Sequence, residues 1–294
     1  PRAGRGRLNF SRELCMSRAW WRSHRVAHRG GGVRVVQLTD THLCKARGGT
    51  LLGMDTDRSL QAVISRVERE RPGIDLLLGT GDLSDRGARS AYERLQIYFD
   101  QLCPDSFWLP GNHDDRAEME AVVNHSARLS SEIRVAGWQI LMLDSQVPGQ
   151  VGGRLGEQEL ALLDTALQMA REEALYTLVC LHHQPMAIGC DWLDEQMVAD
   201  AGDFFGILDR YAGVRGVLWG HVHQQVSRRR NGVLLMASPS TCVQFAPGST
   251  DFQADDEPPG YRWLDLCPDG SIETDISRVR DVHFHVELDS GGYL

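Results

Sequence analysis

From residue 33 onward, short apolar runs alternate with segments whose apolar residues recur every three to four positions. Short apolar runs bounded by Gly, Pro or Asp predict buried strands, and the longer period predicts amphipathic helices. The alternation predicts an α/β fold built on a mostly parallel sheet. The predicted strands cover residues 33–38, 74–78, 107–109, 138–143, 177–181, 214–219 and 233–237, with two later strands near 261–266 and 271–276.

Two of the intervening segments have a clear helical period. The first can be capped by Asp55 or Thr56 and is stopped by Pro72. Its apolar stripe consists of Leu60, Val63, Ile64 and Val67. The second covers about residues 157–173, and its stripe consists of Leu160, Leu163 and Leu167. Both stripes indicate packing against a sheet rather than chemistry.

A polar motif directly follows five of the predicted strands. The motifs are Asp40-Thr41-His42, Gly81-Asp82, Gly111-Asn112-His113-Asp114, His182-His183 and Gly220-His221-Val222-His223. In such folds, ligands bind beyond the carboxyl ends of the strands, where the loops converge. We therefore expect the five motifs to meet at one rim, and we expect their glycines to allow sharp turns and close backbone approach. One such motif would be weak, but five in this order indicate a site.

The residue types at this rim favour phosphoester hydrolysis at a two-metal centre. Two cations can clamp the attacking and leaving oxygens of an anionic phosphodiester, and a hydroxide shared by them can be the nucleophile. Asp82 is placed to bridge the cations and offset their repulsion. A set of nitrogen and oxygen ligands without thiolate suits Mn, Fe, Co, Ni or Zn better than Ca or Mg. No Ser or Cys nucleophile is required.

These motifs resemble the calcineurin-like metallophosphoesterase superfamily, whose pattern D-x-H, G-D, G-N-H-[D/E], H and G-H-x-H is matched without a missing ligand from Val33 to His223. The resemblance implies a sandwich of two mixed β-sheets flanked by helices in α-β-β-α layers. It implies one metallophosphoesterase domain over residues 33–294, including C-terminal strands at 260–280. It also implies two divalent transition metal ions per chain, for which we expect Fe or Mn, with Zn, Co or Ni as alternatives.

The same resemblance implies a role for each site residue. One metal would take Asp40, His42, Asp82 and His223, and the other would take Asp82, Asn112, His182 and His221. His113 would lie near the leaving-group oxygen as proton donor or orienter, with Asp114 holding its ring. The residues expected to contact the substrate are His42, Asn112, His113 and His223. Either His182 or His183 could be the ligand, and we prefer His182 because it comes first after the strand.

Three segments that supply no ligands carry a closer likeness. Residues 189–194, 238–245 and 259–262 look like the bacterial 3',5'-cyclic AMP phosphodiesterases of the class III group. This likeness, and not the metal chemistry, implies hydrolysis of cyclic AMP to 5'-AMP and a lowering of cellular cyclic AMP. Within the likeness, Trp192 could stack on a purine or pack in the core. Arg86 could contact phosphate, or it could pair with Asp85 on the surface.

Three other functions compete with this hypothesis. A broad-specificity phosphodiesterase or phosphomonoesterase would use the same site chemistry. A nuclease would share the metals but needs a basic groove for a long backbone. A catalytically silent binding scaffold with this fold would be expected to lack ligands, and none is lost here. We therefore expect a small cyclic nucleotide as substrate and no nucleic acid or membrane partner. The sequence leaves open a monomer or a homodimer.

The net charge of −9 is unevenly distributed. The first 32 residues carry eight arginines against Glu13, so the remainder is strongly acidic, which disfavours a polyanionic substrate. Residues 1–32 lack periodicity and are predicted to be a basic, disordered arm. It could be a tether for nucleic acid or an anionic membrane, or an extension outside the native protein, with Met16 as the true start. Its histidines and tryptophans are expected to be incidental.

The seven cysteines are scattered and include no C-x-x-C motif. An odd, unpaired set points to reduced thiols and a cytoplasmic location, not to a disulfide framework. No stretch approaches the ~18 apolar residues of a membrane helix.

Overall fold

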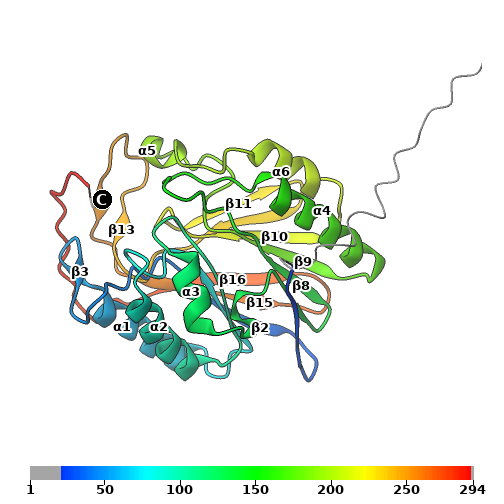
Figure 1. The fold of residues 1–294 in the computed structure, drawn as a ribbon, viewed down its shortest axis with the longest axis horizontal. Helices are drawn as coiled ribbons and strands as arrows, with labels where there is room; N and C mark the ends of the chain where they lie inside the picture. The colour runs from blue at the N-terminus through cyan, green and yellow to red at the C-terminus, as the bar shows by residue number, and fades with distance from the viewer. Residues whose placement is uncertain (1–20, 293–294) are drawn as a thin grey trace, which may run out of the picture.

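The computed structural model describes residues 21–292, which form two β-sheets packed face to face with helices on both outer sides (Figure 1). The larger sheet has the strand order β1 (Ser23–Val26), β7 (Glu132–Val135), β8 (Trp138–Met142), β9 (Tyr176–Cys180), β10 (Val214–Trp219), β12 (Val233–Ala237) and β11 (Val226–Arg230). The smaller sheet has the order β16 (Ile272–Arg278), β15 (Gly260–Leu266), β2 (Val33–Leu38), β5 (Leu76–Thr80) and β6 (Ser106–Leu109).

Both sheets are mixed, as the family resemblance implies. Strands β8, β9, β10 and β12 are parallel, and so are β2, β5 and β6, whereas β7, β11, β15 and β16 add antiparallel pairs. The inner faces bury a continuous apolar layer that includes Val35, Leu78, Leu178, Leu218 and Leu264. Removing this surface from water stabilises the sandwich and fixes the register of the strands.

Helices cover the two outer faces. Side chains of α1 (Thr56–Glu70) and α2 (Arg89–Leu102) pack on the smaller sheet, and those of α4 (Gly156–Glu172) and α6 (Ala201–Leu208) pack on the larger one. The remaining elements are shorter: α3 (Arg116–Val123), α5 (Asp191–Asp194), a 3₁₀ turn at Ala127–Leu129, and the small ribbons β3 (Thr50–Leu51), β4 (Met54–Asp55), β13 (Gln244–Phe245) and β14 (Ala254–Asp255). No helix among the described residues is long and apolar enough to cross a membrane.

The two predicted helices are confirmed. Asp55 caps α1 by accepting a hydrogen bond from the backbone N–H of Arg58, and the whole predicted stripe of α1 is buried. In α4, Leu163 and Leu167 are buried as expected, but Leu160 is only partly buried and Leu162 takes the inner position.

The predicted strands at 33–38, 214–219 and 233–237 match in both bounds, and the others differ by up to two residues at an end. Strands β7 and β11 were not predicted, because charged residues such as Glu132 and Arg229 interrupt their apolar pattern. Helices α2, α3 and α6 were not predicted either.

The expectation of a disordered arm over residues 1–32 is wrong for part of its length. Strand β1 pairs in parallel with β7, and Val26 is buried in the layer between the sheets. Trp21 donates its indole N–H to Glu132, and His28 lies 3.5 Å from the Asp75 carboxylate. Without β1, strand β7 would be an edge strand with unpaired backbone N–H and C=O groups, and pairing with these groups orders the residues of β1. Residues 1–20 lie outside the described part of the chain.

Candidate metal centre

All five polar motifs meet where the strands end. Strands β2, β5 and β6 of the smaller sheet lead to Asp40, Asp82 and Asn112, and strands β9 and β10 of the larger sheet lead to His182 and His221. Both sheets therefore contribute to one rim. Asn112 is half-buried, and the other six predicted ligands are buried: Asp40, His42, Asp82, His182, His221 and His223.

The first group of side chains is formed by Asp40, His42 and His223. The ring atom Nε2 of His223 lies 3.3 Å from Asp40 Oδ1 and 3.2 Å from His42 Nε2. His223 donates its Nδ1–H to the carbonyl oxygen of Val243, so Nε2 carries a lone pair. A lone pair facing a carboxylate is repulsive unless a cation or proton lies between them. The spacing fits ligand atoms about 3–3.5 Å apart around one metal ion.

Asp82 connects this group to a second one. Its Oδ2 lies 3.8 Å from His42 Nε2 and 3.3 Å from His182 Nε2. His182 Nε2 is also 3.3 Å from Asn112 Oδ1, while its Nδ1 donates to the carbonyl oxygen of Thr80. One carboxylate oxygen thus faces imidazole nitrogens from both groups, which is the arrangement that a bridging ligand requires.

The backbone is strained at this rim. Five of the predicted ligands have a positive φ: Asp40 (53°), His42 (44°), Asp82 (49°), His221 (64°) and His223 (49°). Residues other than glycine seldom adopt this conformation, and each instance costs on the order of 1–3 kcal/mol. Such conformations persist where the surroundings fix them and cluster at functional sites.

Two glycines are required by close packing in the motifs. A Cβ on Gly111 would lie 2.2 Å from Asp82 Oδ1, and one on Gly220 would lie 2.2 Å from the Thr39 hydroxyl and 2.7 Å from Asp40 Oδ2. The predicted need for glycine at these turns is confirmed, since any side chain would displace a ligand.

The electrostatics of the site favour a bound cation. Burial and the neighbouring His113 hold the pKa of His42 well below its usual value. Burial also disfavours a charged His182, but the carboxylates of Asp82 and Asp40 outweigh it and raise the pKa of His182 to about 9. The cluster therefore combines a neutral imidazole, the form that binds metals, with carboxylates that attract positive charge. The donor set fits divalent transition metals.

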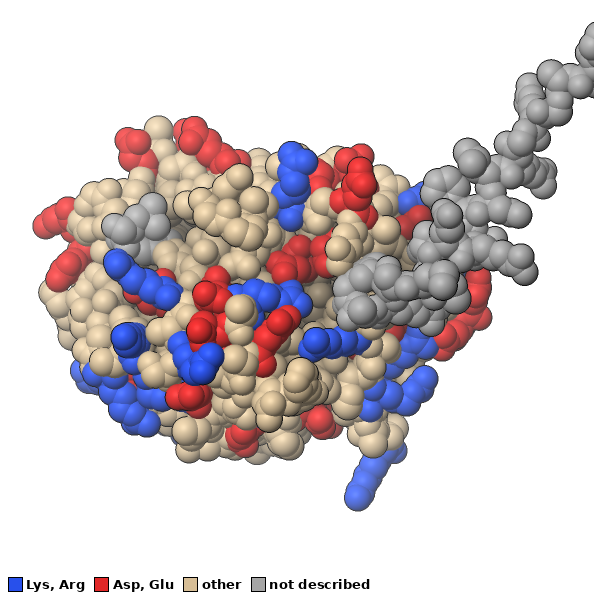
Figure 2. All heavy atoms as spheres, viewed as in Figure 1, with Lys and Arg blue, Asp and Glu red and all other residues tan. Residues whose placement is uncertain are grey.

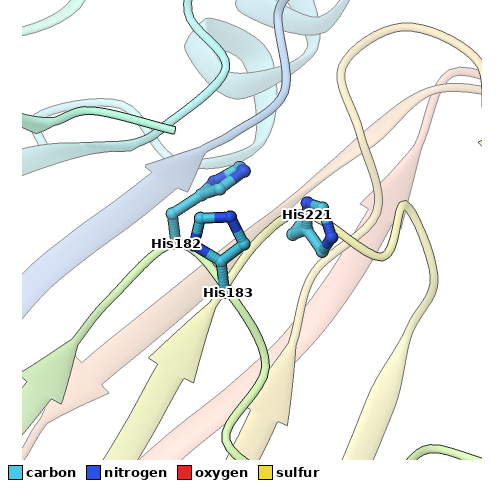
Figure 3. A group of neighbouring side chains, drawn as sticks. All are labelled: His182, His183 and His221. Carbon is cyan, nitrogen blue, oxygen red and sulfur yellow. The ribbon is translucent and has the colours of Figure 1, made fainter. Parts of the chain in front are cut away.

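His182 and His183 are distinguished by their hydrogen bonds. The two rings lie side by side near His221 (Figure 3), and the ring centroids of His183 and His221 are 4.7 Å apart. His183 donates its Nε2–H to the Val151 carbonyl oxygen (3.0 Å) and accepts at Nδ1 from the Ser145 hydroxyl (2.8 Å). Both nitrogens of His183 are thus used in hydrogen bonds, which favours a supporting role for His183 and agrees with the preference for His182 as the ligand.

His113 and Asp114 differ in part from the expectation. His113 Nδ1 donates to the backbone oxygen of Asp85 at 2.9 Å, so this carbonyl orients the ring. The Asp114 carboxylate instead accepts hydrogen bonds from four groups: the backbone N–H of Leu83, Ser84 and Gly111 and the hydroxyl of Tyr92. Asp114 thus ties two metal-binding loops together, and its role as holder of the His113 ring stays a prediction. A buried carboxylate needs these donors.

Asp85 and Tyr92 also belong to the surroundings of the site, although the sequence did not predict this role for them. The side chain of Asp85 is 19% exposed, its Oδ1 lies 3.9 Å from His42 Nδ1, and its backbone orients His113. The sequence did offer one indication that Asp85 belongs to the site, namely its position three residues after Asp82. Tyr92 lies on α2, which was not predicted, and an isolated tyrosine gives no pattern.

The other two candidate residues contact neighbours of the predicted ligands. Arg86 is 81% exposed and its guanidinium is 3.5 Å from the Asp85 carboxylate, the surface pairing that was the alternative to phosphate contact. Trp192 is half-buried, packs edge-on against Phe245 and Phe252, and donates to the Ser249 hydroxyl. These contacts favour packing over base stacking. The six cysteines of the described residues are free thiols.

A family model for calcineurin-like phosphoesterases matches residues 33–225, which include every motif of the rim. The chain belongs to this family. Among curated relatives, it is 46% identical over 261 residues to "3',5'-cyclic adenosine monophosphate phosphodiesterase CpdA" of Pseudomonas aeruginosa, an alignment covering 89% of this chain and 95% of the relative. The protein of the same name from Escherichia coli K12 is 39% identical, with the same coverage of both chains.

Solved structures agree on the fold of this family member. A dimetal phosphatase from Danio rerio superposes with a TM-score of 0.59 at 15% identity, covering 85% of this chain and all of that one. A purple acid phosphatase from yellow lupin gives a TM-score of 0.60 at 15% identity over 88% of this chain and 53% of that one. At this identity the likeness concerns the fold alone. The sandwich expected from the sequence is thus confirmed, and the family is one of metal-dependent phosphoesterases.

Proposed function

We propose that this protein hydrolyses 3',5'-cyclic AMP to 5'-AMP and so lowers the cellular concentration of cyclic AMP. The observation that carries the reaction class is the position of Asp82 Oδ2 between His42 Nε2 and His182 Nε2. The substrate rests on the relatives, which are named as cyclic AMP phosphodiesterases and match the chain over nearly their whole length.

The rim would hold two divalent metals through side chains already in contact. One ion would be bound by Asp40, His42, Asp82 and His223, and the other by Asp82, Asn112, His182 and His221. When bound, the two ions would supply a water-derived nucleophile at neutral pH and offset the charge of the phosphate. We propose Fe or Mn as the two bound metals, because a site with both nitrogen and oxygen donors suits either element.

His113 is the proposed proton donor. Its Nδ1 is held by the Asp85 carbonyl oxygen, and Nε2 is the ring atom that we propose as donor to the substrate. Water adds to phosphorus and loses a proton, and the bond between phosphorus and the 3'-oxygen breaks. That oxygen takes the Nε2 proton of a doubly protonated His113, and the proton released by the water restores that state of His113 after the reaction. The product is 5'-AMP. His42, Asn112 and His223 would contact the phosphate together with His113.

The surface is consistent with a small substrate. On the face drawn in Figure 2, acidic and basic side chains are interspersed. This distribution supports a cyclic nucleotide over a long nucleic acid backbone, which favours a continuous basic groove.

The test is a comparison of substrates after removal of metals and reconstitution with Fe²⁺ or Mn²⁺. We expect 3',5'-cyclic AMP to be hydrolysed to 5'-AMP with a higher kcat/KM than 2',3'-cyclic AMP or bis(p-nitrophenyl) phosphate. A preference for the aryl diester would instead assign a broad-specificity phosphodiesterase. Formation of 3'-AMP would contradict the proposed bond cleavage.

A further inference from the structure

Three of the ligand histidines, His182, His221 and His223, are each held by a hydrogen bond through one ring nitrogen. In His182 and His223 that nitrogen is Nδ1, and the acceptor is a main-chain carbonyl oxygen. His221 differs in both respects: its Nε2 lies 3.0 Å from the side-chain oxygen Oε1 of Gln196. The acceptor therefore comes from a residue that no motif of the family includes, on the segment that follows α5.

This contact determines which nitrogen of His221 can bind a metal. An amide oxygen can only accept a hydrogen bond, so Nε2 carries the proton and Nδ1 carries the lone pair. We propose that Gln196 is a positioning residue that fixes this tautomer and presents Nδ1 of His221 to the second metal. The proposal rests on the proposed function insofar as that function assigns His221 to a metal.

Gln196 is held in place by its own segment. Its backbone N–H donates to the Leu193 carbonyl oxygen, and that same oxygen accepts from the buried side chain of Gln184. The N–H of Val198 donates to the Gln184 carbonyl oxygen. This anchoring reduces the entropy lost when the Gln196 side chain is ordered against His221.

Neighbouring imidazole rings also support His221. The ring centroid of His183 lies 4.7 Å from that of His221. Gly153 packs so closely on His183 that a Cβ there would lie 2.5 Å from its ring. His221 is thus flanked by the rings of His182 and His183 and oriented by one hydrogen bond of its ring. Of these two supports, the hydrogen bond alone selects the tautomer.

If Gln196 has this role, its removal should lower the affinity for one of the two metals. Loss of an outer hydrogen bond to a metal-ligating histidine commonly reduces metal affinity about 10–100-fold. We expect Gln196→Ala to weaken one metal by this factor and to leave the other unchanged. Gln196→Glu keeps an oxygen acceptor at the same position and strengthens it by its charge, so affinity should remain at least that of the original protein.

The experiment is a titration of metal-free protein with Mn²⁺ and, separately, Co²⁺, followed by calorimetry and by the Co²⁺ absorption spectrum. Glu195→Ala, an exposed neighbour in the same segment, is the matched control. Circular dichroism of each metal-free variant establishes that it is folded. Hydrolysis at saturating metal is then measured, where we expect kcat of Gln196→Ala to recover to within about threefold.

Selective weakening in Gln196→Ala, with affinity kept in Gln196→Glu, supports the proposal. Equal affinity in all variants, or tighter binding in Gln196→Ala, would overturn it, because Nε2 would then be the ligating atom or the contact would be irrelevant. Equal losses in both Gln196 variants would also overturn it and assign a packing role. Absence of metal binding by the unsubstituted protein refutes the proposed function, as distinct from this inference.

Discussion

The rim and the layer between the sheets are built on opposite principles. The layer consists of apolar side chains from regular strands, and no residue of β2, β5, β9 or β10 has a positive φ. The rim begins one or two residues later, and there five ligand residues are strained. At about 1–3 kcal/mol each, this strain is comparable with the entire stability of a typical domain. The comparison indicates that burial of the apolar layer supplies stability, and that this stability offsets the backbone strain that positions the ligands at the rim.

Hydrogen bonds to the loops hold the rim in this state. The Asp114 carboxylate fixes the turns that carry Asp82 and Asn112. The hydroxyl of Ser240 donates to the Asp40 carbonyl oxygen, and the Val243 carbonyl oxygen accepts from His223. Residues 238–245, which the sequence singled out without assigning a role, thus support the first group of ligands.

The largest expected effect comes from removing a rim charge. Asp82→Asn keeps the oxygen that accepts from the His113 N–H but removes the charge shared by both metal positions. We expect kcat/KM for 3',5'-cyclic AMP to fall at least about 10³-fold while the far-ultraviolet circular dichroism remains unchanged. Metal content should fall in parallel, with the exposed Asp256→Asn as control. An undiminished rate would remove Asp82 from the reaction.

The opposite result is expected from the layer between the sheets. Leu264 on β15 is fully buried there, so Leu264→Ala leaves a cavity and should lower the free energy of unfolding by about 2–5 kcal/mol. Urea unfolding measures the loss, and Ile97→Ala, at a side chain that is 55% exposed, is the control. Because the folded rim is unaltered, kcat and KM at 25 °C should stay within about twofold. A large loss of kcat would show that rim and layer are coupled.

The sequence predicted the layer and the rim motifs well, because both are local patterns. Apolar runs such as 214–219 and their following histidines are adjacent along the chain, and glycines such as Gly111 mark the turns. Apart from the convergence of the five motifs, which follows from the fold class, individual contacts between distant segments had no signal in the sequence. Asp114 and Tyr92 meet only after α2 and the loops have folded, and β1 finds its partner more than 100 residues away.

Outside the rim, the protonation of Glu159 should make the stability of the fold depend on pH. Glu159 on α4 accepts a hydrogen bond from the backbone of Asp144, just beyond β8, and burial raises its pKa from 4.5 to about 7. The folded state therefore binds this proton more tightly than the unfolded state. The resulting stabilisation is complete below about pH 4.5 and is lost as pH rises through 7.

Glu159→Gln removes this dependence. We expect the variant to be more stable than the original protein by on the order of 1–3 kcal/mol at pH 8, with the difference vanishing toward pH 5. Urea unfolding between pH 5 and 8 measures it, and the exposed Glu157→Gln is the control. A constant difference across this range would contradict the assignment to Glu159.

The smallest effect is expected at the exposed border of the rim. Arg86 lies four residues after Asp82, yet its side chain is 81% exposed and its guanidinium pairs with Asp85 at 3.5 Å. An exposed pair of this kind is worth less than about 1 kcal/mol, so Arg86→Ala should change stability by at most about 0.5 kcal/mol and kcat/KM for 3',5'-cyclic AMP by less than about threefold. Steady-state kinetics at two ionic strengths test this. A fall of tenfold or more, carried by KM and reduced at high salt, would mean that Arg86 turns inward to the phosphate, and the rim would then extend further than its buried ligands.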